Sequence, residues 1–245
     1  MKILVCMSVV PDTTTKITFT DNNTKFNTQG VQFIINPYDE LSLTKALELA
    51  EKHGGTVTVV NVGQADAEPV IRKALAIGAN DAVRINAEPV DGQFVAEQVA
   101  HLAKTGAYDL IFTGRESIDY NGNQVCGLLG ELLEWPSVNL CTKIEVNGNT
   151  ATVERDIEGG KETLSVQLPA VLSAQKDLCE PRIPNMKGIM AARTKPLSVV
   201  EPQGGSAFAA YTGFENPAPK QSVKMIDAED AGKLIDLLRN EARVI

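Results

Sequence analysis

Residues 114–125 read Gly-Arg-Glu-Ser-Ile-Asp-Tyr-Asn-Gly-Asn-Gln-Val, and they follow the apolar run Leu110-Ile111-Phe112-Thr113. A helical pattern begins near Gln124, which predicts a loop that leaves the carboxyl end of a strand and enters a helix. Nucleotides bind at such loops in open α/β sheets. The amides at the start of the helix can donate hydrogen bonds to a phosphate, and Asn or Gln side chains can hydrogen-bond a sugar or a base. An ordinary strand-to-helix loop rich in turn-forming residues explains the pattern equally well.

The composition limits the class of protein. The chain has 245 residues, of which 43% are hydrophobic and 22% charged, enough for one substantial domain with an appendage or for two small domains. A net charge of -8 and a pI near 4.9 leave no basic surface for nucleic acid. Because neither a long apolar run nor a signal-peptide pattern is found, we expect a cytoplasmic chain without membrane insertion.

Tests for catalytic and metal-binding motifs are negative. The four cysteines form no Cys-x-x-Cys pair, which argues against a disulfide framework and a zinc site. His53 and His101 fall on predicted helices without a metal-binding spacing. The Gly-x-Gly-x-x-Gly, P-loop and Gly-x-Ser-x-Gly motifs are absent. We therefore predict no catalytic residue and no metal site, and favour a subunit that binds a nucleotide cofactor.

Strand and helix patterns alternate over the first 135 residues. Strands are predicted at residues 2–8, 56–62, 81–85 and 108–113, and helices at residues 39–53, 66–77, 91–104 and from 124 to about 135. Two further β-like pieces, at residues 16–20 and 31–35, flank the turn-forming run 21–24 and suggest a hairpin-like excursion. The alternation predicts an α/β fold with a doubly wound, mostly parallel sheet and helices on both faces.

The pattern changes after Trp135-Pro136. Short β-type runs at residues 143–146, 151–156, 163–168 and 170–174, separated by glycine-containing turns, predict an added antiparallel meander. From residue 180 onward, prolines and glycines predict an extended segment without regular structure, until an amphipathic helix at residues 227–243. We interpret residues 1–182 as the α/β domain and residues 183–245 as an arm that packs on another subunit; a flexible tail is the alternative.

Several motifs together resemble the β subunit of electron transfer flavoprotein. They are Asn36-Pro37-Tyr38-Asp39-Glu40, Gly114-Arg115 with Ile118-Asp119 and Asn123-Gln124, Trp135-Pro136, residues 153–164 with residues 168–172, and Glu180-Pro181-Arg182 with Pro184-Asn185-Met186-Lys187. They occur in the family's order and cover most of the chain. The resemblance implies a fold like the adenine-nucleotide α-hydrolases and a non-enzymatic electron carrier that forms a heterodimer with an α subunit. The carrier would accept electrons from acyl-CoA or other flavin dehydrogenases, as in fatty acid oxidation, and pass them to a quinone reductase.

The resemblance also implies cofactors and site residues. A redox FAD would be shared with, and held mainly by, the α subunit, and AMP would lie in this chain. The residues implied to bind the nucleotide are Cys6, Asn36, Pro37, Tyr38, Asp39, Val62, Gly114, Arg115, Ser117, Ile118, Asp119, Asn123, Gln124 and Val125. Ile183, Pro184 and Met186 would contact the partner dehydrogenase, and Asp156 would limit the swinging of the flavin domain.

Some residues depart from the family's pattern. Ser8 stands where a lysine is usual, and Glu116-Ser117 where Gln-Ala is usual. Since Glu116 would bring a negative charge near a phosphate, we expect its side chain to point away from the anion or the anion to lie elsewhere. The loop keeps Asn123-Gln124 of the AMP type but has Val125, as electron-bifurcating relatives with a second FAD do. We favour AMP; the alternatives are a bifurcating subunit with a second FAD and a stand-alone nucleotide-binding regulator of the universal-stress type.

Overall fold

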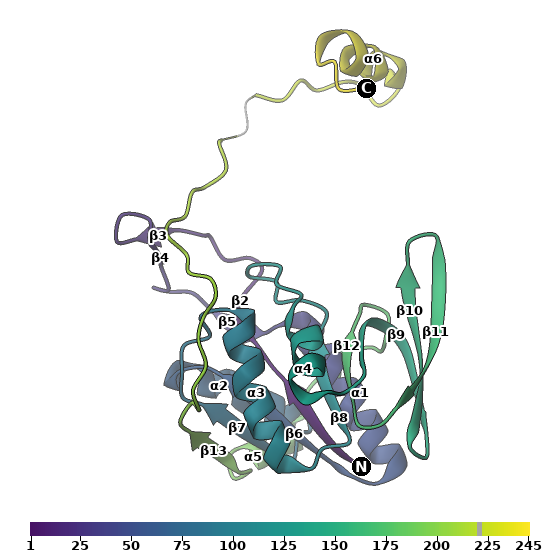
Figure 1. The fold of residues 1–245 in the computed structure, drawn as a ribbon. Helices are drawn as coiled ribbons and strands as arrows, with labels where there is room; N and C mark the ends of the chain where they lie inside the picture. The colour runs from purple at the N-terminus through teal and green to yellow at the C-terminus, as the bar shows by residue number, and fades with distance from the viewer. Residues whose placement is uncertain (220–221) are drawn as a thin grey trace.

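The computed structural model describes residues 1–219 and 222–245, and its core is a nine-stranded sheet of order β11-β10-β9-β12-β8-β1-β6-β7-β13 (Figure 1). The strands of this sheet are β1 (Lys2–Cys6), β6 (Thr56–Val62), β7 (Asp81–Ile85), β8 (Leu110–Gly114), β9 (Ser137–Asn147), β10 (Thr150–Ile157), β11 (Gly160–Gln167), β12 (Ala170–Ala174) and β13 (Leu197–Val200). The main helices are α1 (Pro37–His53), α2 (Glu68–Ile77), which the short 3-10 turn η1 (Ala65–Ala67) precedes, α3 (Gly92–Gly106) and α4 (Val125–Leu133). The predicted α/β fold with a mostly parallel sheet is confirmed.

The central strand β1 shows why the sheet is wound on both faces. It pairs in parallel with β6 on one side and β8 on the other. Ile3 and Val5 point into the core that α1 and α2 cover, whereas Leu4 and Cys6 point into the core that α3 and α4 cover. A strand buried on both faces reads as a continuous apolar run, which is why this region could be predicted.

The position of β12 differs from the prediction. The strands β9, β10 and β11 form the expected antiparallel meander, but residues 170–174 do not continue it. Instead, β12 lies parallel to β8 and to β9, between the parallel core and the meander. All five of its residues are buried, as expected of a central strand and not of a meander edge.

The predicted hairpin-like excursion is also paired differently. Residues 31–35 do not pair with residues 16–20. Here β5 (Phe33–Ile35) is antiparallel to β2 (Val9–Pro11), while the turn joins β3 (Phe19–Thr20) to β4 (Lys25–Phe26). The turn is tight because Asp21, Asn22 and Asn23 all adopt positive φ angles, of 52°, 57° and 62°.

The chain after residue 180 has more regular structure than predicted. The helix α5 (Met186–Ala192) packs on α2, and β13 extends the sheet beside β7. Long-range hydrogen bonds hold this segment: Arg72 Nη1 donates to the carbonyls of Ala192 and Lys195, at 2.9 and 2.7 Å. Lys195 Nζ in turn donates to the carbonyls of Leu75 and Ala79, at 2.9 and 2.6 Å. Residues 186–200 therefore lie on the α/β domain.

The arm begins beyond β13 and follows α3 before it leaves the domain (Figure 1). The buried side chain of Gln98 accepts from the Gln203 amide at 2.8 Å and donates to the Gly204 carbonyl at 3.0 Å. The terminal helix is shorter than predicted and consists of α6 (Ala231–Asp236) and the π-helical turn η2 (Leu237–Glu241), away from the sheet. Within residues 1–219 and 222–245, no helix has the length and apolarity needed to cross a bilayer.

Candidate functional site

A cavity of about 430 Å³ opens at the carboxyl ends of the central strands, where the chain order reverses. From β1 the chain proceeds to β6 and β7 on one side, and β8 and β12 lie on the other side. This reversal is the position at which open α/β sheets bind ligands. Most of the predicted nucleotide-binding residues line the cavity: Cys6, Asn36, Asp39, Val62, Gly114, Arg115, Ser117, Asp119, Asn123 and Val125. Pro37, Tyr38, Ile118 and Gln124 are not among the lining residues.

Asp39 connects the two sides of the reversal. It lies in the first turn of α1 and is only 3% exposed. Its Oδ2 accepts from the amide of Ser8, just after β1, at 2.7 Å, and its Oδ1 accepts from the amide of Gly114, at the end of β8, at 2.8 Å. One carboxylate therefore fixes the loops that follow two neighbouring strands.

Burial changes the acid-base properties of the groups beside this junction. Burial raises the pKa of Asp39 to about 7, although hydrogen bonds from Ser8, Asn36 and Gly114 oppose the rise. Burial, followed by the nearby charge of Asp39, raises the pKa of the Cys6 thiol far above its ordinary value. The thiol of Cys6 is therefore neutral at physiological pH, and its place in the site is that of a small wall residue.

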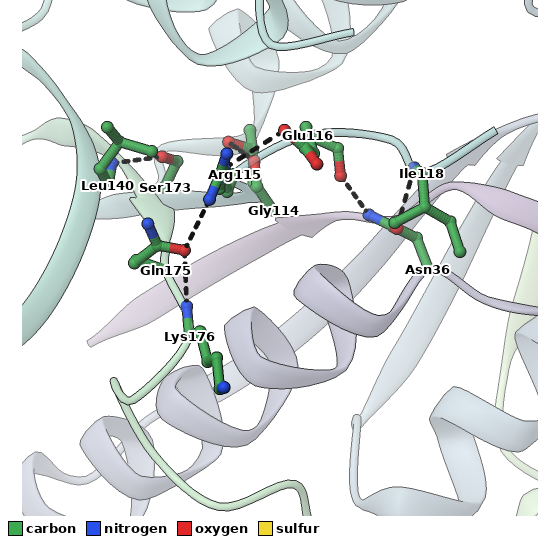
Figure 2. A network of polar contacts seen from close by, with 10 residues as sticks. Asn36, Gly114, Arg115, Glu116, Ile118, Leu140, Ser173, Gln175 and Lys176 are labelled. Carbon is green, nitrogen blue, oxygen red and sulfur yellow. Dashed lines mark hydrogen bonds and ion pairs between the residues drawn. The ribbon is translucent and has the colours of Figure 1, made fainter. Parts of the chain in front are cut away.

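Asn36 holds the long loop after β8 in place, as Figure 2 shows. Its Nδ2 donates to the carbonyl of Glu116 at 2.7 Å, and its Oδ1 accepts from the amide of Ile118 at 3.4 Å. Farther along, the amide of Ser117 donates to the carbonyl of Gly122 at 3.0 Å, and the Ser117 hydroxyl donates to Asp119. The N-terminus of α1 thus organises a loop that is 80 residues away in the sequence.

The Glu116 carboxylate is directed at its neighbour Arg115, with Oε2 3.2 Å from Nε (Figure 2). Arg115 Nη1 lies 3.5 Å from Gln175 Oε1, and the guanidinium stands 5.7 Å from the centre of the Tyr38 ring. The ion pair lacks hydrogen-bond geometry, so the buried Nε of Arg115 keeps no acceptor within the described residues. The charge of Glu116 is therefore partly neutralised by Arg115, which also lines the cavity.

The helix α4 begins at the end of the loop without a side-chain cap. Its N-cap residue is Gln124, and Val125 and Cys126 line the cavity. The first amides of a helix have no partner inside the helix, and they favour an anion. This end of the cavity is consequently suited to a phosphate group.

More residues line the cavity than the ten that were predicted. Ser8, Asn61, Gly63, Asp66, Glu88, Asp91 and Tyr120 line the cavity, with several apolar residues. Asn61 and Gly63 could have been predicted to line the cavity, because they lie at the carboxyl end of β6, which ends at Val62. The carboxyl ends of parallel strands lie at the same edge of the sheet. Asp91 is recognisable as the N-cap of α3, but its proximity to the loop depends on the tertiary fold.

Charge is distributed unevenly around the cavity. Among residues 1–219 and 222–245, six acidic side chains line it, namely Asp39, Asp66, Glu88, Asp91, Glu116 and Asp119, against the single basic side chain of Arg115. Most of these acids are wholly or partly exposed, and Asp39 is buried. An anionic ligand would therefore depend on backbone amides and Arg115.

The residues predicted to contact other proteins lie elsewhere. The side chain of Ile183 is 87% exposed, and Met186, at the start of α5, is also largely exposed. Pro184 lines a small cleft between α2 and α5. Asp156 lies near the end of β10, where its Oδ1 is 3.8 Å from Lys161 Nζ. The roles of these residues remain predictions.

The sheet order and the cavity at its reversal define a doubly wound α/β protein with a candidate ligand site at the strand ends. Residues 23–203 match the family described as "Electron transfer flavoprotein domain". The chain is 39% identical over 259 residues to the electron transfer flavoprotein subunit beta of Bacillus subtilis (strain 168), with both chains fully covered. It is 34% identical over 249 residues to that of Syntrophomonas wolfei, covering 98% of it, and 33% identical over 252 residues to the human protein, covering 99%. The chain belongs to the electron transfer flavoprotein β-subunit family, as its motifs indicated.

Proposed function

We propose that this chain is the β subunit of an electron transfer flavoprotein, which binds AMP in its cavity and shares a redox FAD with an α subunit. The observation that carries the proposal is the junction at Asp39 and Asn36. These two side chains bring the ends of β1 and β8 and the loop to α4 around one cavity.

The dimensions and donors of the cavity favour a mononucleotide over a dinucleotide. A volume of about 430 Å³ is near the lower end of the usual range for ligand pockets, about 300–1,000 Å³. The uncapped start of α4 offers amides to one phosphate group, and Arg115 supplies a positive charge that Glu116, 3.2 Å away, partly offsets. A second phosphate would have to be placed among the acidic side chains that line the rest of the cavity.

Nucleotide extraction tests the assignment directly. The chain is purified with its α subunit, the complex is denatured, and the released nucleotides are separated by liquid chromatography. We expect about one FAD and one AMP per heterodimer. A result of two FAD per heterodimer would indicate that a second FAD binds in place of AMP. It would support the bifurcating alternative, which Val125 favours. That alternative also predicts NADH oxidation coupled to two electron acceptors.

A stand-alone regulator of the universal-stress type is the alternative from another class. It shares the α/β core but requires no second subunit. The exposed apolar residues of the arm argue against it, because Val223, Met225, Leu234 and Ile235 lie in solvent in the isolated chain. A chain that binds nucleotide but shows no affinity for any α subunit would support the regulator instead.

The proposed partners follow from the same role. We place the carrier in the cytoplasm, where it would accept electrons from acyl-CoA or other flavin dehydrogenases and deliver them to a quinone reductase. The exposed segment at Ile183 and Met186 would contact the dehydrogenase. Asp156 would restrain the flavin domain of the α subunit from the meander side.

A further inference from the structure

Asp39 is a buried carboxylate without a compensating cation. Both of its oxygens accept backbone amides, from Ser8 and Gly114, and no basic side chain of residues 1–219 and 222–245 pairs with it. The amides stabilise its negative charge, while burial disfavours that charge. It lines the same cavity in which a nucleotide phosphate is proposed to bind.

The titratable and charged groups on the elements around Asp39 do not neutralise its negative charge. Cys6 of β1 stays neutral because burial holds the pKa of its thiol high. After β8, Arg115 is engaged by Glu116, 3.2 Å away, so this pair adds little net charge. On α1 itself, Tyr38 is flanked by the Arg115 guanidinium, and Glu40 pairs with Lys73 at 2.8 Å.

A phosphate that enters this cavity adds negative charge to the space that the buried Asp39 carboxylate lines. Like charges that share a site disfavour the ionised form of the acid. The repulsion is relieved when Asp39 binds one proton from solvent, since the neutral carboxyl group retains acceptor capacity for the Ser8 and Gly114 amides. The walls of the cavity therefore need not separate when the charge is lost.

We propose that an adenine nucleotide binds in this cavity together with a proton, and that Asp39 is the group that takes up the proton. The inference rests on the proposed nucleotide-binding function. It adds that Asp39, which positions the loops after β1 and β8, becomes protonated when the nucleotide binds. Because the pKa of Asp39 is about 7 in the nucleotide-free chain, the uptake is largest just above neutral pH, where the free carboxylate is ionised.

Titration calorimetry measures the uptake. The full-length heterodimer, cleared of nucleotide, is titrated at pH 8 with AMP and with adenosine, in two buffers that differ in ionisation enthalpy. At this pH the AMP phosphate is fully ionised, since its second pKa is about 6. We expect AMP to take up a large fraction of one proton and adenosine to take up none. Above neutral pH, the affinity for AMP should fall by up to about tenfold per pH unit relative to adenosine.

Two variants assign the proton. Asp39→Asn removes the titrating group and should abolish the uptake, whereas Glu88→Gln removes a charge of the same sign from the exposed rim and should leave the proton count unchanged. Should Asp39→Asn fail to fold, the infrared difference spectrum of the unmodified protein decides the question, because AMP binding should add the carbonyl band of a protonated carboxyl group.

The possible results distinguish a failure of the proton-uptake proposal from a failure of the proposed nucleotide-binding function. AMP binding with no dependence on the buffer, or with unchanged uptake in Asp39→Asn, overturns the proton inference and leaves the nucleotide assignment standing. Failure of AMP, adenosine and FAD to bind overturns the proposed function and the inference with it.

Discussion

Gly114 is a residue of the site with no room for a side chain. A Cβ built at this position would collide with the Asp39 carboxylate and the Tyr38 Cβ, and would make a tight contact with the Asn36 amide. These atoms belong to the start of α1 and are fixed by the hydrogen bonds of the junction. Gly114→Ala should therefore lower the free energy of unfolding by about 1–3 kcal/mol, as overpacked cores do, and weaken nucleotide binding. Urea denaturation measures the first effect and equilibrium binding the second.

Gly127 is the matched control for this substitution. It lies in α4 with open space around its Cβ position. Gly127→Ala should leave the free energy of unfolding unchanged or raise it by up to about 1 kcal/mol, because alanine restricts the unfolded chain. Equal losses of stability in both variants would show that the crowding at Gly114 is not the cause.

The charge state of Asp39 predicts a pH dependence of stability. Its pKa rises from 3.8 to about 7 on folding because the group is buried. Between these pH values the folded chain holds a proton that the unfolded chain has released, so its contribution to the free energy of unfolding decreases as the pH rises. Denaturation of the nucleotide-free protein and of Asp39→Asn from about pH 4 to pH 8 should show this decrease as a difference between the two. A difference that grows with pH would contradict the argument.

At the level of elements, Asp91 links α3 to the arm. Its Oδ1 caps α3 by accepting from the Phe94 amide at 2.8 Å, and its Oδ2 accepts from the amides of Phe208 and Ala209 at 2.6 and 2.9 Å. Burial opposes ionisation here, but these backbone donors hold the pKa of Asp91 below its ordinary value. Asp91→Ala should cost about 1 kcal/mol of stability through the lost cap and release the arm.

A serine at the same position separates the two roles. Asp91→Ser keeps a side-chain oxygen for the cap but removes the oxygen that holds the arm. We expect nearly unchanged stability together with faster hydrogen exchange at the Phe208 and Ala209 amides. If exchange at these amides is the same in Asp91→Ser and the unmodified chain, the arm is held by other contacts, such as those of Gln98.

The elements that could be predicted from the sequence are those determined by local pattern. The strands Thr56–Val62 and Asp81–Ile85 occur at the predicted residues, since an apolar run between turn formers defines each. The elements α5 and β13 were missed because prolines surround them and their stability comes from contacts with α2 and β7. For the site, the family resemblance predicted Asn36 and Asp39. Their function as a clamp on Ser8 and Glu116 became visible only in the fold.

For the whole molecule, the proposed contact between Ile183 and a partner dehydrogenase leads to a testable prediction. The side chain is 87% exposed beside α5, on a segment that Arg182 anchors to Glu51 at 2.7 Å. An apolar anchor of this kind usually contributes more than 1 kcal/mol to binding. Ile183→Asp should slow reduction by the dehydrogenase about tenfold or more, while the flavin content of the heterodimer stays unchanged. Ile157→Asp, an exposed isoleucine on β10, is the control and should have little effect.

The terminal helix predicts how the two subunits hold each other. In the isolated chain, α6 and η2 bury no residue, and Met225, Leu234 and Ile235 are exposed. A helix this short is marginal in water without packing, so we expect it to be stable only against the α subunit. Hydrogen exchange should show residues 231–241 unprotected in the isolated chain and protected in the heterodimer. Leu234→Asp should weaken the heterodimer at least tenfold, as loss of an anchor at an interface does, whereas the neighbouring Lys233→Gln should not. Unchanged affinity in Leu234→Asp would mean that the arm binds through residues 203–214 and that the terminal helix has another partner.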